Sequence, residues 1–366
     1  MSRSPACSVH ELCSGTKDGL YLAQFSPSAD FIAASDGSGC IHVLQRQKSS
    51  SSSSSLSGED YRVDYVPFKT PLQCSSTGDQ LSTSEKVVSV AFSWRPESGQ
   101  ISQKSVLTMC RTDGHLQQFH AATGRSLGEV NAYAEAGKTS DDDAGTSLPA
   151  LLCIDYAPDG ASFATGGKEP EVFVFDEMTK KKRQTLQRSD KNGGGHSSRV
   201  CACKFLDGNL LATGGWDCTL QFWDLRKGSR SIHSVYGPSL LGPAALDVSG
   251  SVIVAGSYSE GSGLQCFDLR RMGPGLQLGK PEPSGDAGFS QQEAPAGMRV
   301  TSCQISSKSS LALGGFCRRS QRGFLRISDT LDLLLDSPCT SAVFAQSEPR
   351  LVACTTRDGQ LRILHV

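Results

Sequence analysis

The chain has 366 residues, of which 37% are apolar and 20% are charged, and its formal net charge is −1. This near-neutral charge excludes a general electrostatic attraction to nucleic acid or to an anionic membrane. No apolar run approaches the length needed to span a bilayer, and residues 1–15 lack the apolar centre of a signal peptide. We therefore expect a soluble protein of the cytosol or the nucleus, with no nucleic-acid and no membrane partner.

Short β-prone runs separated by turn residues recur along the chain, and they group into seven copies of one pattern. Seven copies in 366 residues average about 52 residues each. In chain order the copies cover residues 19–44, 86–94 with 105–124, 150–179, 193–227, 246–270, 300–328 and 340–366.

The fourth copy, residues 193–227, is the clearest. It opens with Gly195-His196 and closes with Trp223-Asp224, and three apolar runs lie between these pairs. It resembles a WD40 repeat, whose signature is Gly-His followed by Trp-Asp across the four strands of a propeller blade. The resemblance implies an all-β protein, a single seven-bladed β-propeller of four-stranded antiparallel blades spanning residues 1–366.

Three stretches account for the length in excess of the roughly 40–45 residues expected of a WD40 unit. Residues 48–60 contain an unbroken serine run, residues 131–148 are small and acidic, and residues 279–297 are rich in Gly, Pro, Ser and Gln. Their apolar content is too low for a packed core. We expect them to be disordered loops between blades.

The two ends of the chain are complementary. The last copy stops after its third strand, while residues 6–13 form a short β-prone run with no other assignment. We expect this N-terminal run to pair as the outer strand of the last blade. Such pairing closes the ring and removes an open strand edge that would invite aggregation.

The resemblance implies that four side chains of the fourth copy hold its blade together: His196, Thr213, Asp217 and Trp223. A buried indole N–H can only donate, so it needs an acceptor such as the Thr213 hydroxyl. His196 would link Thr213 onward, and Asp217 would orient the imidazole. We expect this group to be structural rather than catalytic.

Motifs for catalysis or cofactor binding are weak. The chain has no HExxH, no GxSxG and no CxxC pair among its 14 cysteines. Residues 132–139 fit a relaxed phosphate-loop pattern, but Asp141, Asp142 and Asp143 follow it and would repel phosphate. Cys201 and Cys203 share one strand face, yet they fit better as core cysteines in a reducing compartment. We expect no enzyme activity, no cofactor and no metal.

The favoured function is a scaffold that binds other proteins or peptides on one face of the propeller. The resemblance maps Trp216, Arg199, Lys168, Tyr258 and Arg357 to loops on that face. Trp216 is interpreted either as an exposed anchor for a partner or as a ring lying flat over the neighbouring blade. An exposed tryptophan beside arginines is typical of an interface hot spot.

Two alternatives stay open. The ending Trp223-Asp224-Leu225-Arg226 resembles the box with which substrate receptors of cullin-4 ubiquitin ligases dock on their adaptor. Asp224 and Arg226 would take part, with Arg270 in a degenerate second copy. A third hypothesis rests on Arg318-Arg319, which resembles the paired arginines of phosphoinositide-binding propellers, although Cys317 and Ser320 depart from the flanking residues of that family.

Overall fold

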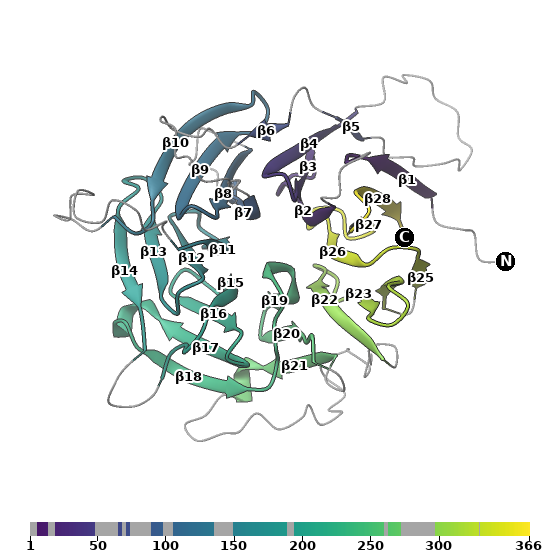
Figure 1. The fold of residues 1–366 in the computed structure, drawn as a ribbon. Coiled ribbons are helices and arrows are strands. Elements are labelled where there is room, and N and C mark those ends of the chain that lie inside the picture. The colour runs from purple at the N-terminus through teal and green to yellow at the C-terminus, as the bar shows by residue number, and fades with distance from the viewer. Residues whose placement is uncertain are drawn as a thin grey trace, which may run out of the picture.

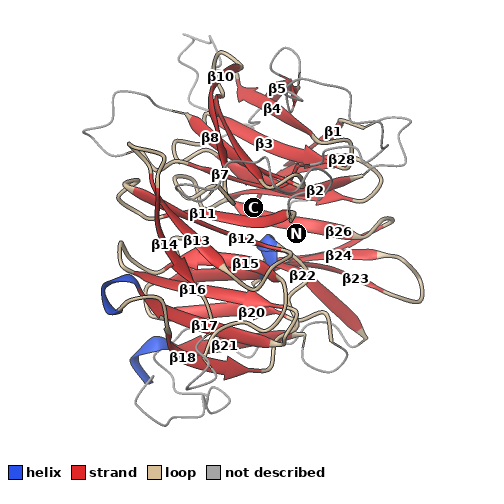
Figure 2. Cartoon of the chain, turned by 60° about the vertical axis from the view of Figure 1, so that its left-hand side comes forward, coloured by secondary structure: helices blue, strands red, loops and turns tan. Residues whose placement is uncertain are grey.

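The computed structural model describes residues 6–13, 19–47, 65–67, 71–73, 89–97, 105–134, 149–188, 194–259, 263–271, 297–328 and 330–366. These residues form seven antiparallel sheets that stand in a ring around a central axis (Figure 1). Strands dominate the described residues, beside three single-turn helices (Figure 2): η1 (Leu225–Lys227), η2 (Pro243–Ala245) and η3 (Leu269–Arg271). The predicted seven-bladed, all-β propeller is confirmed.

Each of the first four blades places its first strand next to the axis and its later strands progressively outward (Figure 1). In the first blade two short segments, β5 and β6, both pair with β4. The strands of these blades are β2 (Leu20–Phe25), β3 (Phe31–Asp36), β4 (Cys40–Arg46), β5 (Tyr65–Pro67) and β6 (Leu72–Gln73); β7 (Ser89–Trp94), β8 (Val106–Arg111), β9 (His115–His120) and β10 (Arg125–Asn131); β11 (Leu151–Tyr156), β12 (Ser162–Gly167), β13 (Val172–Asp176) and β14 (Lys182–Leu186); β15 (Val200–Phe205), β16 (Leu210–Gly215), β17 (Thr219–Asp224) and β18 (Ser231–Tyr236).

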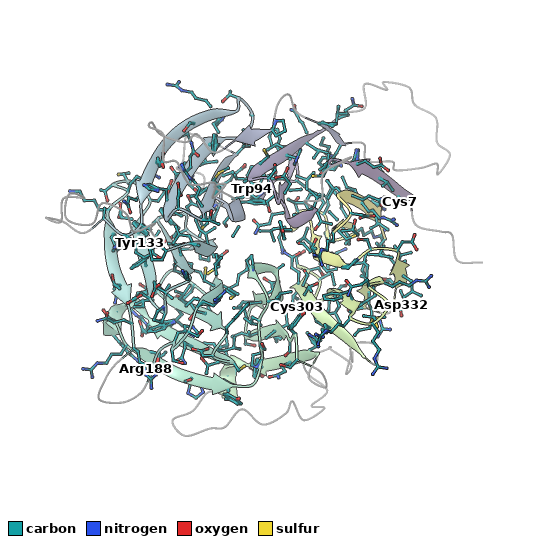
Figure 3. The ribbon with its side chains drawn as sticks, viewed as in Figure 1. Cys7, Trp94, Tyr133, Arg188, Cys303 and Asp332 are labelled. Atoms are coloured by element: carbon teal, nitrogen blue, oxygen red, sulfur yellow. The ribbon has the colours of Figure 1, made fainter. Side chains whose placement is uncertain are left out.

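The remaining three blades follow the same order, and the fifth has three strands within the described residues. Figure 3 shows Cys303, from the sixth blade's inner strand, near the centre of the ring and Asp332, from its outer strand, at the rim. The strands are β19 (Leu246–Ser249), β20 (Val252–Gly256) and β21 (Leu264–Asp268); β22 (Met298–Ile305), β23 (Leu311–Cys317), β24 (Gly323–Ile327) and β25 (Leu331–Leu335); β26 (Cys339–Phe344), β27 (Leu351–Thr356), β28 (Gln360–His365) and β1 (Ala6–Glu11).

The ring is closed by the N-terminal strand, as predicted. Strand β1 pairs antiparallel with β28, in a register that runs from Ala6 opposite His365 to Glu11 opposite Gln360. The backbone N–H of Leu12 extends the contact by donating to the Gly359 carbonyl at 3.1 Å. Both ends of the chain therefore contribute strands to the seventh blade.

The hydrophobic core is divided among the interfaces between neighbouring blades. Seven clusters of buried side chains can be distinguished among the described residues, and each draws on two adjacent blades. The cluster between the seventh and first blades contains Ile363 and Ile32, for example, and the one between the third and fourth contains Val174 and Trp223. Inner strands are apolar on both faces for this reason.

Side chains of the inner strands also bond directly to the next blade. Asp155 Oδ2 accepts from the Phe205 N–H at 2.9 Å, and Asp247 Oδ2 accepts from the Ile305 N–H at 2.8 Å. Lys204 Nζ lies 3.3 Å from Asp155 Oδ1. Burial raises the pKa of Asp247 to about 6, although Lys204 opposes the shift.

The predicted inserts fall mostly outside the described residues, which contain nothing of 48–60 and only Gly297 of 279–297. The insert at 131–148 was placed too early, because its first residues are structured. Asn131 ends β10, Ala132 is completely buried, and the Tyr133 ring packs edge-on against Phe173 at 5.1 Å between centroids. None of the helices in the described part of the chain is long and apolar enough to cross a membrane.

Candidate functional site

One end of the inner strands carries an equivalent turn in each of several blades. After the second strand of a blade, a backbone N–H donates to the carbonyl that precedes the first strand, and this ties the turn to the ring. Four of the five residues predicted to bind partners occupy this position. The bonds join Lys168 to Ala150 (2.8 Å), Trp216 to Arg199 (3.0 Å), Tyr258 to Ser239 (2.9 Å) and Arg357 to Pro338 (3.0 Å).

We call the surface formed by these turns the turn face. Lys168 and Arg357 are exposed on it. Arg318 and Arg319 are also exposed, in the turn after β23, which is the second strand of the sixth blade. The turn face therefore brings together several cations that are distant in the sequence.

Trp216 is a large side chain of this face that is open to solvent, with 49% of its surface exposed. The guanidinium carbon of Arg199 lies 4.1 Å from the centre of its ring. This is a cation–π arrangement, which holds the indole in one orientation while part of it stays exposed. Trp216 thus stacks on a residue of its own blade.

Tyr258 is less available than the prediction supposed. It is half-buried, and its ring packs against Phe316 of the sixth blade at 6.2 Å between centroids. The guanidinium carbon of Arg299 lies 4.3 Å from the same ring centre. Arg299 could not be predicted as a functional residue, because it lies near the start of an apolar strand and carries no motif.

The four residues of the fourth blade form a continuous hydrogen-bonded chain. Trp223 Nε1–H donates to Thr213 Oγ1 at 2.8 Å, and Thr213 Oγ1 lies 2.8 Å from His196 Nε2. His196 Nδ1 lies 2.9 Å from Asp217 Oδ2. Since Thr213 already accepts from the indole, its hydroxyl donates to Nε2, and the imidazole proton sits on Nδ1 facing Asp217.

This chain is closed to solvent at its centre, because His196, Thr213 and Trp223 have no exposed surface. Burial alone would raise the pKa of Asp217, but the hydrogen bonds and charge of its neighbours, His196 foremost, lower it to about 2. Asp217 also accepts from the backbone N–H groups of Ser197 and Thr219. The arrangement fixes the turn that presents Trp216 and offers no access to a substrate.

We expect Trp223→Phe to lower the free energy of unfolding by roughly 1–3 kcal/mol. The change keeps an aromatic ring but removes the indole N–H from Thr213 and leaves unfilled volume. Phe175 stands at the equivalent position of the third blade, so the ring should survive. Urea unfolding of the variant and of the native chain measures the difference. An unchanged stability would contradict the role given to the hydrogen-bonded chain.

The residues of the adaptor hypothesis lie at the other end of the fourth blade and in the fifth blade beside it. Arg226, in η1, directs Nε and Nη2 at the two oxygens of Asp224, at 2.9 and 3.0 Å. Arg270, in η3, donates from Nε and Nη2 to the two oxygens of Asp268 in the same way, at 3.1 and 2.8 Å. The side chains of Arg226 and Arg270 are 65% and 62% exposed. Neighbouring blades thus present two arginines in the same geometry.

The remaining sequence candidates are not brought into a site. Ala132, the first residue of the relaxed phosphate-loop pattern, follows the outer strand β10, whereas a phosphate loop needs a buried strand before it. Cys201 and Cys203 are buried in β15, and burial raises the pKa of both thiols. They behave as core residues.

Residues 185–224 match the family described as "WD domain, G-beta repeat". Several curated proteins are similar over short segments. "DDB1- and CUL4-associated factor 10" of Homo sapiens is 32% identical over 88 residues, which are 24% of this chain and 15% of that protein. The "Poly(A)+ RNA export protein" of Schizosaccharomyces pombe is 29% identical over 112 residues, or 30% and 26% of the two chains. The "Ribosome biogenesis protein WDR12 homolog" of Drosophila mojavensis is 32% identical over 83 residues, or 20% and 19%. The matches therefore span about a quarter or less of each relative.

Proposed function

Because the chain is a WD40-repeat β-propeller, we propose that it is a non-enzymatic scaffold that binds proteins or peptides on its turn face. The observation that carries the proposal is the half-exposed Trp216 ring, held in place by Arg199 at 4.1 Å. A large side chain that is both exposed and already ordered loses little conformational freedom when a partner covers it. Tryptophan and arginine are also the residues most often found at the centres of interfaces.

The charges around Trp216 suit a partner that is neutral or acidic where it meets the turn face. Lys168, Arg357, Arg318 and Arg319 are exposed there and belong to three turns in three different blades. They would form the rim around the Trp216 anchor, where charges contribute more to association rate and specificity than to affinity. We place this activity in the cytosol or nucleus and expect no nucleic-acid or membrane partner.

We expect Trp216→Ala to weaken partner binding by at least ~2 kcal/mol, or roughly thirty-fold in Kd, with little change in the melting temperature. Partners are first identified by affinity capture of the native chain from its own cells followed by mass spectrometry, and their Kd is then measured for each variant. Arg226→Ala is the matched control. It also removes an exposed side chain, but at the end of β17 opposite to Trp216.

A second candidate function is docking on the adaptor of a cullin-4 ubiquitin ligase. It is supported by the identical, exposed presentation of Arg226 and Arg270 and by the partial similarity to a DDB1- and CUL4-associated factor. Binding of purified DDB1 to the native chain, lost in Arg226→Ala and kept in Trp216→Ala, would establish it. If Arg226→Ala alone also removes the captured partners, the turn-face proposal is wrong and the ligase receptor replaces it.

A phosphoinositide-binding function is the third and weakest candidate. Arg318 and Arg319 are exposed, but the chain lacks the flanking residues of the family motif. Flotation with vesicles containing phosphoinositides tests it, and Arg318→Ala with Arg319→Ala should abolish any binding seen.

A further inference from the structure

Three side chains with metal-binding atoms converge where the ends of the chain meet. Cys13 Sγ lies 3.8 Å from Asp36 Oδ2 and 3.8 Å from His42 Nε2, and these last two atoms are 2.8 Å apart. These three side chains lie close enough together to hold one ion. Among the described residues, they form the one such group of three or more Cys, His, Asp or Glu side chains. Cys13 follows β1, Asp36 ends β3 and His42 lies on β4.

The cluster is not a copy of the hydrogen-bonded chain in the fourth blade. The strand registers, with Ala34 opposite His42 and Thr213 opposite Gln221, make His42 equivalent to Gln221 and Asp36 equivalent to Gly215. A Cβ atom at Gly215 would lie 2.9 Å from His196 Nδ1, so the carboxylate of Asp36 points into the space that an imidazole fills in the fourth blade. The first blade has therefore replaced the usual residues with a different set.

The Asp36 carboxylate is oriented by its own turn. Oδ1 accepts from the Ser38 N–H at 2.8 Å, the Ser38 hydroxyl at 2.7 Å and the Cys40 N–H at 2.9 Å. Oδ2 is thereby directed at His42 and Cys13. Hydrogen bonds that fix a carboxylate in this way are typical of the outer shell of metal sites.

The position of Cys13 is fixed as well. The Leu12 N–H donates to the Gly359 carbonyl, and a Cβ atom at Gly359 would lie 2.8 Å from the Cys13 Cβ. The glycine, with φ of 87°, lets the chain that leaves β1 lie directly on the turn before β28. Cys13 is 8% and Asp36 5% exposed, so the group is largely shielded from water.

The geometry does not suit a catalytic relay. In a Cys–His–Asp relay the imidazole uses one nitrogen for the nucleophile and the other for the carboxylate. Here His42 Nε2 faces both Asp36 and Cys13. Three donor atoms directed at one point is instead the arrangement of metal ligands.

We propose that Cys13, Asp36 and His42 bind one Zn²⁺ ion, with a fourth position open to water or another ligand. Thiolate, imidazole and carboxylate are the ligand types that zinc takes together, at about 2.3, 2.0 and 2.0–2.2 Å. Tetrahedral ligands at those lengths lie roughly 3.3–3.6 Å apart. The two sulfur separations are close to this, and the Asp36–His42 pair must open by about 0.5 Å. Binding forms the Zn–S, Zn–N and Zn–O bonds, and it releases the thiol proton to water. The imidazole proton of His42, which faces Asp36 from Nε2, moves to Nδ1 so that Nε2 can bind the ion.

Such a site would join two neighbouring blades at the place where the ring closes. Cys13 continues the outer strand of the seventh blade, whereas Asp36 and His42 belong to the first blade. A shared ion therefore links the N-terminal strand to the blade that follows it in the ring. Since the ion binds only the closed form with high affinity, zinc should stabilise the closed propeller. This inference is independent of the proposed function.

The test compares zinc binding by the full chain and its variants in a non-chelating reductant. We expect Cys13→Ser and His42→Gln each to hold about one equivalent of zinc less than the native chain, since one shared ion is lost. Glutamine is the residue found at the equivalent position of the fourth blade, so His42→Gln should fold. Zinc should raise the melting temperature of the native chain and leave that of both variants unchanged.

Two further variants separate a metal site from a structural contact. Cys7→Ser removes an exposed thiol of β1 and should retain full zinc binding. Ser38→Ala keeps all three ligands but loses the hydroxyl that orients Asp36, and it should weaken zinc binding about 10–100-fold. Cobalt loading supplies a second readout, a thiolate-to-cobalt absorption band that Cys13→Ser lacks and Cys7→Ser keeps. Equal zinc content and equal cobalt spectra for the native chain and Cys13→Ser would overturn the proposal.

Discussion

Deleting residues 1–14 is expected to give a protein that is insoluble on expression or that melts several degrees below the full chain. The deletion removes β1 and leaves β28 as an open edge with unpaired N–H and C=O groups, which invites aggregation. It also removes Cys13 from the cluster between the seventh and first blades, together with Leu12, which packs against that cluster. Full burial of a leucine contributes about 1.5–3 kcal/mol, and the partly buried Leu12 contributes less than that.

Val9 contributes little to this effect, because half of its surface is exposed. A chain that begins at Ala6 is the matched control, since it keeps β1 whole and should melt like the full chain. Both truncations are compared in a chelator, so that the result does not depend on any bound metal. A protein without residues 1–14 that stays soluble and melts with the full chain would show that ring closure does not need β1.

The inner strands could be predicted because their residues are buried on both faces. The run at Val200–Phe205 has the bounds of β15, and three such runs in most copies gave the correct number of blades. The closing strand was predicted for a different reason, namely that the last copy lacked an outer strand. Patterns of apolar residues predicted the strands, the resemblance to WD40 repeats implied the propeller, and the need to cover an edge predicted the closing strand.

The outer strands could not be predicted from apolar runs, because they pack on one side only. Strand β10 is mostly exposed, and β18, Ser231–Tyr236, alternates exposed residues with half-buried or buried ones. The sequence pattern of the fourth copy therefore ends at Lys227, before its fourth strand begins at Ser231. An outer strand forms because the third strand of the blade needs a hydrogen-bonding partner. A hydropathy pattern does not reveal this need.

Contacts between blades were also beyond the sequence. Cys13, Asp36 and His42 carry no spacing motif, because ring closure brings Cys13 to the first blade. A signal did exist in the repeat itself, since His42 stands where the fourth copy has Gln221 and Asp36 where it has a glycine. Tyr258 was predicted to be on the turn face, but its burial depends on Arg299 and Phe316 of the next blade.

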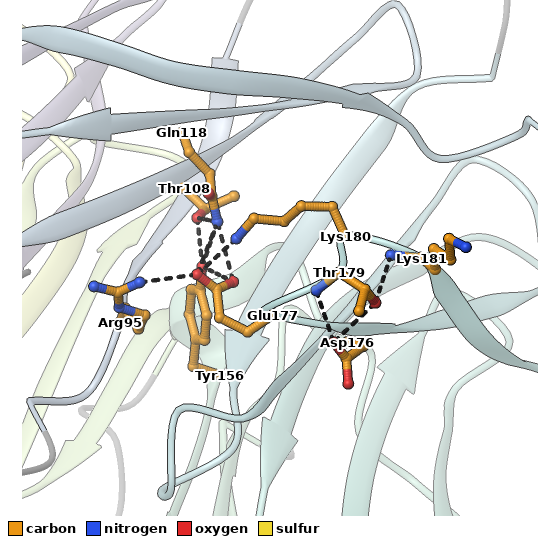
Figure 4. Close-up of polar contacts among 9 residues, drawn as sticks. All are labelled: Arg95, Thr108, Gln118, Tyr156, Asp176, Glu177, Thr179, Lys180 and Lys181. Atoms are coloured by element: carbon orange, nitrogen blue, oxygen red, sulfur yellow. Dashed lines mark hydrogen bonds and ion pairs between the residues drawn. The ribbon is translucent and has the colours of Figure 1, made fainter. Parts of the chain in front are cut away.

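Glu177 is the residue whose loss we expect to destabilise a blade interface most. Its carboxylate accepts from Tyr156 at 3.0 Å and from Gln118 Nε2 at 3.1 Å, and it pairs with Arg95 at 3.1 Å and Lys180 at 2.7 Å (Figure 4). Arg95 and Gln118 belong to the second blade, whereas Tyr156 and Glu177 belong to the third or follow its third strand. Burial raises the pKa of Tyr156 and lowers that of Lys180, as expected of groups withdrawn from water.

Glu177→Ala should therefore lower the free energy of unfolding by roughly 3–5 kcal/mol, because it leaves two cations and two neutral donors without their shared acceptor. Glu177→Gln keeps the shape but not the charge, and it should fall between Glu177→Ala and the native chain. The control is Asp332→Ala, which breaks an ion pair with Arg326 at the rim, where Asp332 is 57% exposed (Figure 3). An exposed pair contributes about 0–1 kcal/mol. Urea unfolding of the three variants measures these differences in the free energy of unfolding. Equal decreases for Glu177→Ala and Asp332→Ala would mean that the buried network does not stabilise the interface between the second and third blades.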